Sequence, residues 1–184
     1  MVDDLVGLFD ALFPNNRREV VVVGHSMGGA IAAHAVSSKR IQNVRGLVLI
    51  DIVEGSAMDS LPSIPMFINA RPQTLESVES AIRWHIESNS IQNHESARLS
   101  YWKEWYSGLS KTFVSAPTAK LLVLAGTDRL DKELLIAQMQ GKFQLEVLPL
   151  AGHTVQEDLP DRVGDIVVLF WKRNRPLNIP VTRL

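Results

Sequence analysis

Residues 19–37 read EVVVVGHSMGGAIAAHAVS and decide the fold of this chain. The run Val20–Val23 is entirely β-branched, which predicts a strand covered on both faces in a parallel sheet. The turn Gly24-His25-Ser26-Met27-Gly28 follows directly, and an alanine-rich segment of high helix propensity comes after it. A strand, a tight G-x-S-x-G turn and a helix in this order predict a nucleophile elbow with Ser26 as the nucleophile.

The glycines of this turn have a physical reason. A nucleophile elbow holds its serine in a strained backbone conformation, and its neighbours must be small for strand and helix to approach. The turn also points the backbone N–H of Met27, near the positive end of the helix dipole, at the place where an oxyanion would form. We therefore predict an oxyanion hole that includes the Met27 N–H. The alternative interpretation is a structural strand-to-helix turn with an ordinary serine.

The composition is that of a globular chain. The 184 residues are 46% hydrophobic and 21% charged, and the formal net charge is −1. This length fits one domain with a sizeable core, and the near-neutral charge argues against a nucleic-acid partner. The chain has no cysteine, which excludes disulfides, thiolate catalysis and cysteine-ligated metals and fits a reducing compartment. Without a long apolar run or a basic leading segment, we expect no membrane association and no secretory signal.

Further strands and helices alternate along the chain. Apolar residues between positions 5 and 13 recur at helical spacing and predict an amphipathic helix that stops at Pro14. Three more strands are expected after the elbow helix, at Gly46–Ile52, Lys120–Ala125 and Gln144–Leu148, and a closing amphipathic helix begins near Pro160. This alternation predicts an α/β fold, a single domain over residues 1–184 with a mostly parallel sheet and helices on both faces.

The region from Glu54 to Ala116 interrupts the alternation. It contains two apolar stripes at helical spacing, one at residues 75, 78, 82 and 86 and one formed by Trp102, Trp105, Tyr106 and Leu109. Two helices between consecutive strands predict a helical cap inserted over the strand ends. We interpret the aromatic stripe as the core of this cap, because such stripes usually mark packing.

A serine nucleophile needs a general base held by a third group, and the chain has five histidines. Four of them lie in the elbow, in the helix after it or in the predicted cap: His25, His34, His85 and His94. The side chain of the elbow histidine is expected to point away from the nucleophile. Only His153 follows the last strand in a Gly-His turn, where a loop can carry its imidazole over the strand ends. We therefore predict that His153 is the base.

Two carboxylates compete for the role of the third group. Asp51 ends the strand after the elbow helix, and Asp128 follows the next strand. Both can reach an imidazole at the carboxyl edge of the sheet. Position favours Asp128, the commoner place for this fold, but the pattern alone does not decide between them.

A resemblance to a known family rests on six segments: GHSMGGAIAAH, LIDIVEGSAMDSL, RPQTLESVESAI, NHESAR, AGTDRLDKELLIAQMQGKFQLEVLP and GHTVQEDLPD. They are similar to the protein phosphatase methylesterase-1 family, over nearly all of residues 20–172. The resemblance implies an α/β-hydrolase that removes the methyl ester from the C-terminal leucine of the protein phosphatase 2A catalytic subunit, without a metal or organic cofactor. It also implies an intracellular protein, in the cytoplasm, the nucleus or both.

The resemblance also implies which residues carry the chemistry. In that family the nucleophile, the acid and the base lie in the segments that match GHSMGG, LIDIVEG and GHTVQED. Carried over to this sequence, they are Ser26, Asp51 and His153. The resemblance therefore favours Asp51 over Asp128, which is left with a role in structuring its loop.

Two departures from the family pattern lead to a further expectation. The family has several strands and a glycine-rich loop upstream of the elbow, and a longer cap segment where this chain joins Ser100 to Tyr101. We therefore expect a chain that lacks the N-terminal part, exposes a sheet edge at Val20–Val23 and has weak or no esterase activity. One alternative function is a non-catalytic chain that binds the phosphatase or is inactive. Another is a generic serine hydrolase of small esters.

Overall fold

The computed structural model describes residues 1–14, 18–64, 66, 77, 106–126 and 130–175. Most of the predicted cap lies outside these residues, including the stripe at residues 75–86 and both Trp102 and Trp105. Five further residues named above also lie outside them: His85, His94, Ser100, Tyr101 and Asp128.

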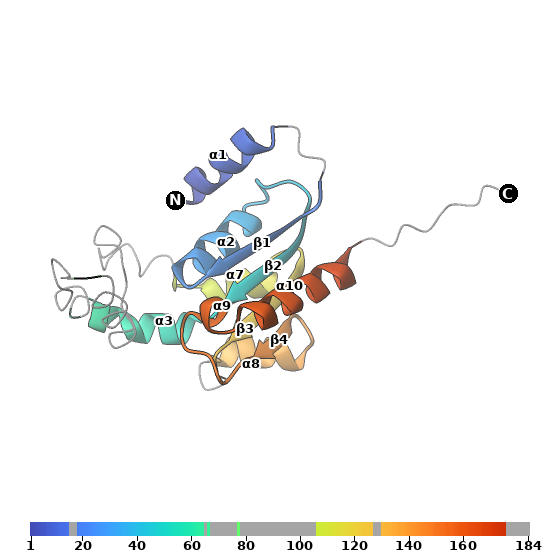
Figure 1. The fold of residues 1–184 in the computed structure, drawn as a ribbon. Helices are drawn as coiled ribbons and strands as arrows, with labels where there is room; N and C mark the ends of the chain where they lie inside the picture. Colours follow the sequence, from blue (N-terminus) through green and yellow to red (C-terminus); the bar gives the residue numbers. More distant parts are fainter. Residues whose placement is uncertain (15–17, 65, 67–76, 78–105, 127–129, 176–184) are drawn as a thin grey trace.

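Four parallel strands form the sheet, side by side in their order along the chain (Figure 1). They are β1 (Val20–His25), β2 (Val44–Ile50), β3 (Ala119–Leu124) and β4 (Gln144–Val147). The predicted strands agree with these to within two residues at each end. The α/β fold with a parallel sheet is therefore confirmed.

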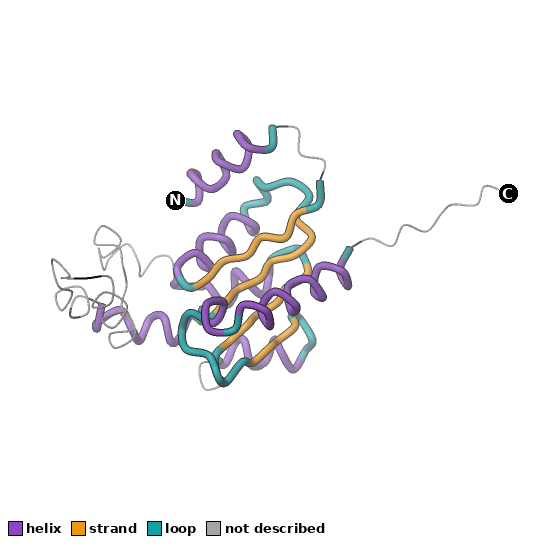
Figure 2. Tube along the Cα trace, in the orientation of Figure 1, coloured by secondary structure: helices purple, strands orange, loops and turns teal. Residues whose placement is uncertain are grey.

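Helices cover both faces of the sheet (Figures 1 and 2). One face packs against α2 (Met27–Ser37), α7 (Leu109–Ser115) and α8 (Lys132–Met139). The other face packs against α9 (Val155–Asp158) and α10 (Pro160–Asn174). The first helix, α1 (Val2–Leu12), lies against α2, and α3 (Glu54–Ser60) with the short 3-10 helix η1 (Leu61–Ser63) follows β2. The predicted opening and closing helices are confirmed.

The core follows from the alternation of side chains along the two inner strands. In β2, Leu47 and Leu49 face α2 and α7, whereas Val48 and Ile50 face α10. All four side chains are buried, and the same holds for residues 121–124 of β3. Strands that are covered on both faces therefore have continuous apolar sequences, as expected for a parallel sheet.

β1 differs from the prediction of a strand covered on both faces. Val20, Val21 and Val22 are half-buried, and the side chain of Val23 is 46% exposed. Within the described residues β1 pairs with one strand, β2, so it lies at the edge of the sheet. The helix on this face, α10, packs over β2 instead, where the ring of Phe170 fills the space that a side chain at position 46 would need. The prediction of full burial was therefore wrong, whereas the expected sheet edge is present.

No helix in the described part of the chain is both long enough and apolar enough to cross a membrane.

Candidate active site

Ser26 lies between the end of β1 and the start of α2, at the N-cap of that helix. Its backbone has φ 51° and ψ −126°, which is unusual for a residue with a side chain. Such a conformation costs about 1–3 kcal/mol and persists only where its surroundings enforce it. Here the Ser26 N–H donates to the carbonyl of Ile50, and the Ser26 carbonyl accepts from the Gly29 N–H at 2.8 Å. The predicted elbow is present.

Two glycines allow strand and helix to come this close. A Cβ atom on Gly24 would collide with the backbone of Gly28 and Gly29. A Cβ atom on Gly29 would lie 2.6 Å from Cγ2 of Ile52, which is closer than real carbon contacts. The first turn of α2 therefore packs directly on the sheet, and the turn between them stays tight.

Asp51 directly follows β2, and the end of the neighbouring strand β3 holds it by two hydrogen bonds. Its N–H donates to the carbonyl of Val123 at 2.8 Å, and its Oδ1 accepts the Ala125 N–H at 3.1 Å. Asp51 is only 3% exposed and has φ 46°, in the left-handed region. The end of β3 thus fixes the carboxylate that follows β2.

His153 stands in the loop between β4 and α9, and its imidazole joins Asp51 to Ser26. Nδ1 lies 2.6 Å from Oδ2 of Asp51, and Nε2 lies 3.1 Å from Oγ of Ser26. The loop is held by Asp158 of α9, whose Oδ2 accepts the Gly152 N–H at 2.7 Å. The His153 side chain is 43% exposed, so solvent reaches this end of the site.

The partners of the imidazole determine its tautomer. A carboxylate only accepts hydrogen bonds, so Nδ1 of His153 carries the proton and donates it to Asp51. In the neutral ring Nε2 then carries no hydrogen and accepts from the Ser26 hydroxyl. A base in this tautomer can take the proton of the serine when the oxygen attacks a carbonyl carbon. The arrangement is therefore suited to acyl transfer.

Met27 is the first residue of α2. N–H groups in the first turn of a helix have no acceptor within that helix, and the dipole favours negative charge there. The predicted oxyanion donor thus lies beside Ser26, in the part of the helix where an anion is stabilised. Within the described residues, no group of three or more side chains could hold a metal ion.

His25, the elbow histidine, has a contact that sequence reasoning missed. Its Nε2 lies 2.8 Å from the main-chain carbonyl oxygen of His153. Burial lowers the pKa of His25 below its ordinary value, which favours the neutral ring. No signal in the sequence could have paired two residues so far apart. His34, another of the candidate bases, lies within α2.

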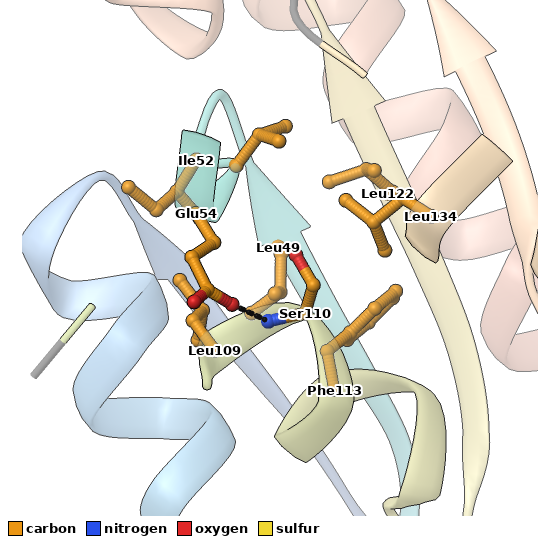
Figure 3. Close-up of a pocket in the computed structure, with 9 residues that line it drawn as sticks. Leu49, Ile52, Glu54, Leu109, Ser110, Phe113, Leu122 and Leu134 are labelled. Carbon is orange, nitrogen blue, oxygen red and sulfur yellow. Dashed lines mark hydrogen bonds between the residues drawn. The ribbon is translucent and has the colours of Figure 1, made fainter. Parts of the chain in front are cut away.

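A second group of polar contacts, also unexpected from the sequence, centres on Glu54 and Ser110, whose hydrogen bond is drawn in Figure 3. Both oxygens of Glu54 accept backbone N–H groups at the start of α7, from Gly108 at 2.7 Å and from Ser110 at 2.9 Å. The Ser110 hydroxyl donates to Oδ2 of Asp131 at 2.5 Å, and Oδ1 of Asp131 accepts the Leu134 N–H of α8. These contacts join α3, α7 and α8. Only the helix-capping role of Asp131 had a sequence signal, an aspartate before a helical segment.

Comparison with known families agrees with this geometry. A family model described as "Alpha/beta hydrolase family" matches residues 1–166. The chain belongs to the alpha/beta hydrolase family. Solved hydrolase structures have the same fold: an E-2-(acetamidomethylene)succinate hydrolase gives a TM-score of 0.63 at 21% identity, covering 93% of this chain and 72% of its own. A thermostable carboxyl esterase from Bacillus coagulans gives 0.60 at 15% identity, covering 95% and 71%.

Curated relatives of this alpha/beta hydrolase are named protein phosphatase methylesterase 1. The protein from Schizosaccharomyces pombe is 41% identical, over 88% of this chain and 54% of the relative. The one from Homo sapiens is 36% identical, over 95% and 62%. A probable member from Dictyostelium discoideum is 51% identical, over 77% and 47%. The resemblance predicted from the six segments is therefore confirmed, and the chain spans about half the length of these relatives.

Proposed function

We propose that this chain is a serine esterase that uses Ser26 as nucleophile, His153 as general base and Asp51 as the orienting acid. One observation carries the proposal: His153 bridges the other two, with Nδ1 2.6 Å from Asp51 and Nε2 3.1 Å from Ser26. With the hydrogen of the neutral imidazole on Nδ1, both hydrogen bonds run in the direction that the reaction requires.

The reaction proceeds in two halves. In the first, Oγ of Ser26 attacks the ester carbonyl carbon while Nε2 of His153 takes the hydroxyl proton. Asp51 stabilises the resulting imidazolium, and the Met27 N–H binds the negative oxygen of the tetrahedral intermediate. His153 then returns the proton to the leaving alkoxide, which departs as an alcohol and leaves an acyl-serine ester. In the second half, His153 takes a proton from water, whose oxygen attacks the acyl carbon. His153 then gives this proton to Oγ of Ser26 as the bond from the acyl carbon to Oγ breaks, which releases the acid and restores the free serine.

The proposed substrate is the methyl ester on the C-terminal leucine of the protein phosphatase 2A catalytic subunit. The curated relatives support this choice, because their name describes a methylesterase of a protein phosphatase. The leaving alcohol is then methanol, and the partner of this chain is the phosphatase subunit, in the cytoplasm or the nucleus. The proposal keeps residues 1–184 as one domain, with residues 54–116 as a cap over the strand ends.

A serine-reactive fluorophosphonate tests the nucleophile. The folded chain is expected to react with it, and Ser26→Ala is expected to abolish the reaction. Ser115→Ala, which removes an exposed serine at the end of α7, serves as the matched control and is expected to label like the parent chain. Equal labelling of the parent chain and Ser26→Ala would reject Ser26 as the nucleophile.

Methanol release tests the substrate. The methylated phosphatase subunit should be demethylated by the parent chain, at the low rate expected from its exposed sheet edge, and left unchanged by Ser26→Ala. Hydrolysis of p-nitrophenyl acetate without demethylation of the subunit would instead identify a generic hydrolase of small esters. Binding of the subunit without labelling or turnover would identify a non-catalytic phosphatase-binding protein.

A further inference from the structure

His25 is next to the nucleophile in sequence, but its side chain contacts the loop of the proposed base. Its Nε2 lies 2.8 Å from the carbonyl oxygen of His153, although the two residues are 128 positions apart. The two rings also touch, with centroids 4.8 Å apart and planes inclined at 47°. His25 therefore holds both the backbone and the ring of His153.

The position of His25 in β1 explains how it reaches this loop. Side chains alternate along a strand, so His25 projects from the same face of the sheet as Val21 and Val23. Val21 packs in the core on the side of α9 and α10. The loop that carries His153 passes into α9 on that side. His25, at the end of β1, can thus contact this loop through its side chain. The next residue, Ser26, follows the turn of the backbone to the ends of the strands.

The chemistry of the contact fixes the state of the His25 ring. A carbonyl oxygen only accepts hydrogen bonds, so Nε2 of His25 must carry the hydrogen. The bond therefore exists in both the neutral and the protonated ring. Because the ring is partly buried, its pKa lies below the ordinary value, although the hydrogen bond to the His153 carbonyl and the charges of Asp51 and Glu157 act in the opposite direction. The neutral ring places no positive charge beside His153 when that residue takes a proton.

We propose that His25 is a positioning residue for the proposed base: its Nε2–H holds the main-chain carbonyl of His153, which keeps the imidazole of His153 between Asp51 and Ser26. This inference rests on the proposed function. In this proposal His25 itself transfers no proton. Its effect on the reaction is geometric, and a displacement of about 1 Å in a catalytic group can lower turnover by about 10²-fold.

Three substitutions distinguish the effect of the hydrogen bond from the effect of the contact between the two rings. His25→Phe keeps an aromatic ring against His153 but removes the donor. His25→Gln places an amide N–H where Nε2 lies and keeps the bond without a titratable group. His25→Asn carries the same amide one methylene shorter and does not reach the carbonyl, so it is the matched control for the glutamine variant.

Turnover gives the first measurement. His25→Phe and His25→Asn are expected to lower kcat and the rate of fluorophosphonate labelling by about ten- to a hundredfold, with KM unchanged. His25→Gln is expected to restore both rates to near those of the parent chain. A hydrogen bond that only stabilised the fold would leave kcat and the labelling rate of the folded variants unchanged. Parent-like rates in both the phenylalanine and the asparagine variants would overturn the inference. If the phenylalanine variant does not fold, the comparison of His25→Gln with His25→Asn is the test, and equal rates in these two variants would overturn the inference.

The proton between His153 and Asp51 gives a second measurement that needs no turnover. A proton in a short N–H···O bond resonates far downfield, and the chain should show one such line assigned to Nδ1 of His153. The line should persist in His25→Gln and broaden or disappear in His25→Asn. If it is identical in all variants, His25 does not position the imidazole. If instead Ser26→Ala still reacts with the fluorophosphonate, the proposed function fails, whatever the spectra show.

Discussion

The imidazole of His153 donates from Nδ1 to Oδ2 of Asp51 at 2.6 Å, across 102 positions of sequence. The carboxylate is fully buried at this contact, and its second oxygen is held by the Ala125 N–H. A hydrogen bond to a buried carboxylate is stronger than one in water, because few water molecules compete for the oxygen. The contact therefore favours Asp51 as the partner of the proposed base.

Replacing Asp51 by asparagine should lower turnover by about 10⁴, as the loss of the orienting carboxylate does in Ser-His-Asp enzymes. The amide has similar size but can hold the imidazole in the wrong tautomer. Methanol release measures the effect. Asp128→Asn, the alternative from sequence, is expected to cost far less, and the reverse ranking would assign the acid to Asp128.

Gly29→Ala should destabilise the chain by about 1–3 kcal/mol, because the new methyl group would overlap the Ile52 side chain. Gly28→Ala is the matched control, since a Cβ atom there meets nothing within 4 Å. Alanine should stabilise this helical position by about 0.5–1 kcal/mol. Urea unfolding followed by circular dichroism measures both. If the two alanines have equal effects, strand and helix are less closely packed than described.

Ser110→Ala should lower the unfolding free energy by about 1–3 kcal/mol, because Oδ2 of Asp131 loses the hydrogen bond from the buried Ser110 hydroxyl. Ser110 is only 2% exposed. Ser115→Ala, in the same helix but exposed, should change stability by no more than about 0.5 kcal/mol. Chemical unfolding of the two variants checks this difference, and equal midpoints would show that the link to Asp131 contributes nothing.

The stability of the chain should depend on pH through His25. Its pKa in the folded chain lies below the ordinary value of 6.5, so the unfolded chain binds a proton more readily. The contribution of His25 to the unfolding free energy is therefore fully present above pH 6.5, and it is lost as the pH drops from there toward the folded pKa of His25. Unfolding free energies measured across this range should have a smaller slope in His25→Gln. An unchanged slope would mean that the pKa of this ring is the same in both states.

Much of the fold could be predicted because local sequence determines it. The continuous apolar runs of β2 and β3 identified buried strands, and the glycines around Ser26 identified the elbow. The edge position of β1 was harder, since a valine run has the same pattern at the edge of a sheet as in its centre. Exposure of Val23 depends on which elements cover that face, and this is a property of the assembled layers.

Parts of the candidate site could also be proposed from local sequence. Ser26 and His153 lie in short motifs, whereas two strand ends each offered a carboxylate, and only the family resemblance favoured Asp51. The bond from His25 to the His153 carbonyl depends on the path of a loop after β4. The pairing of Glu54 with the start of α7 spans more than fifty positions. Such contacts have no periodic signal, so they become visible only in three dimensions.

Glu54 also affects how freely this chain can change length in evolution. Its carboxylate, at the start of α3, accepts hydrogen bonds from the N–H groups of Gly108 and Ser110. The two ends of the segment between Glu54 and Gly108 are therefore held together. Lengthening a closed loop costs only about 0.6 kcal/mol for each doubling of its residues. Insertions and deletions between these fixed ends are therefore inexpensive, and they leave the spacing of Ser26, Asp51 and His153 untouched. The number of residues between Glu54 and Gly108 can thus change in evolution while the candidate site keeps its geometry.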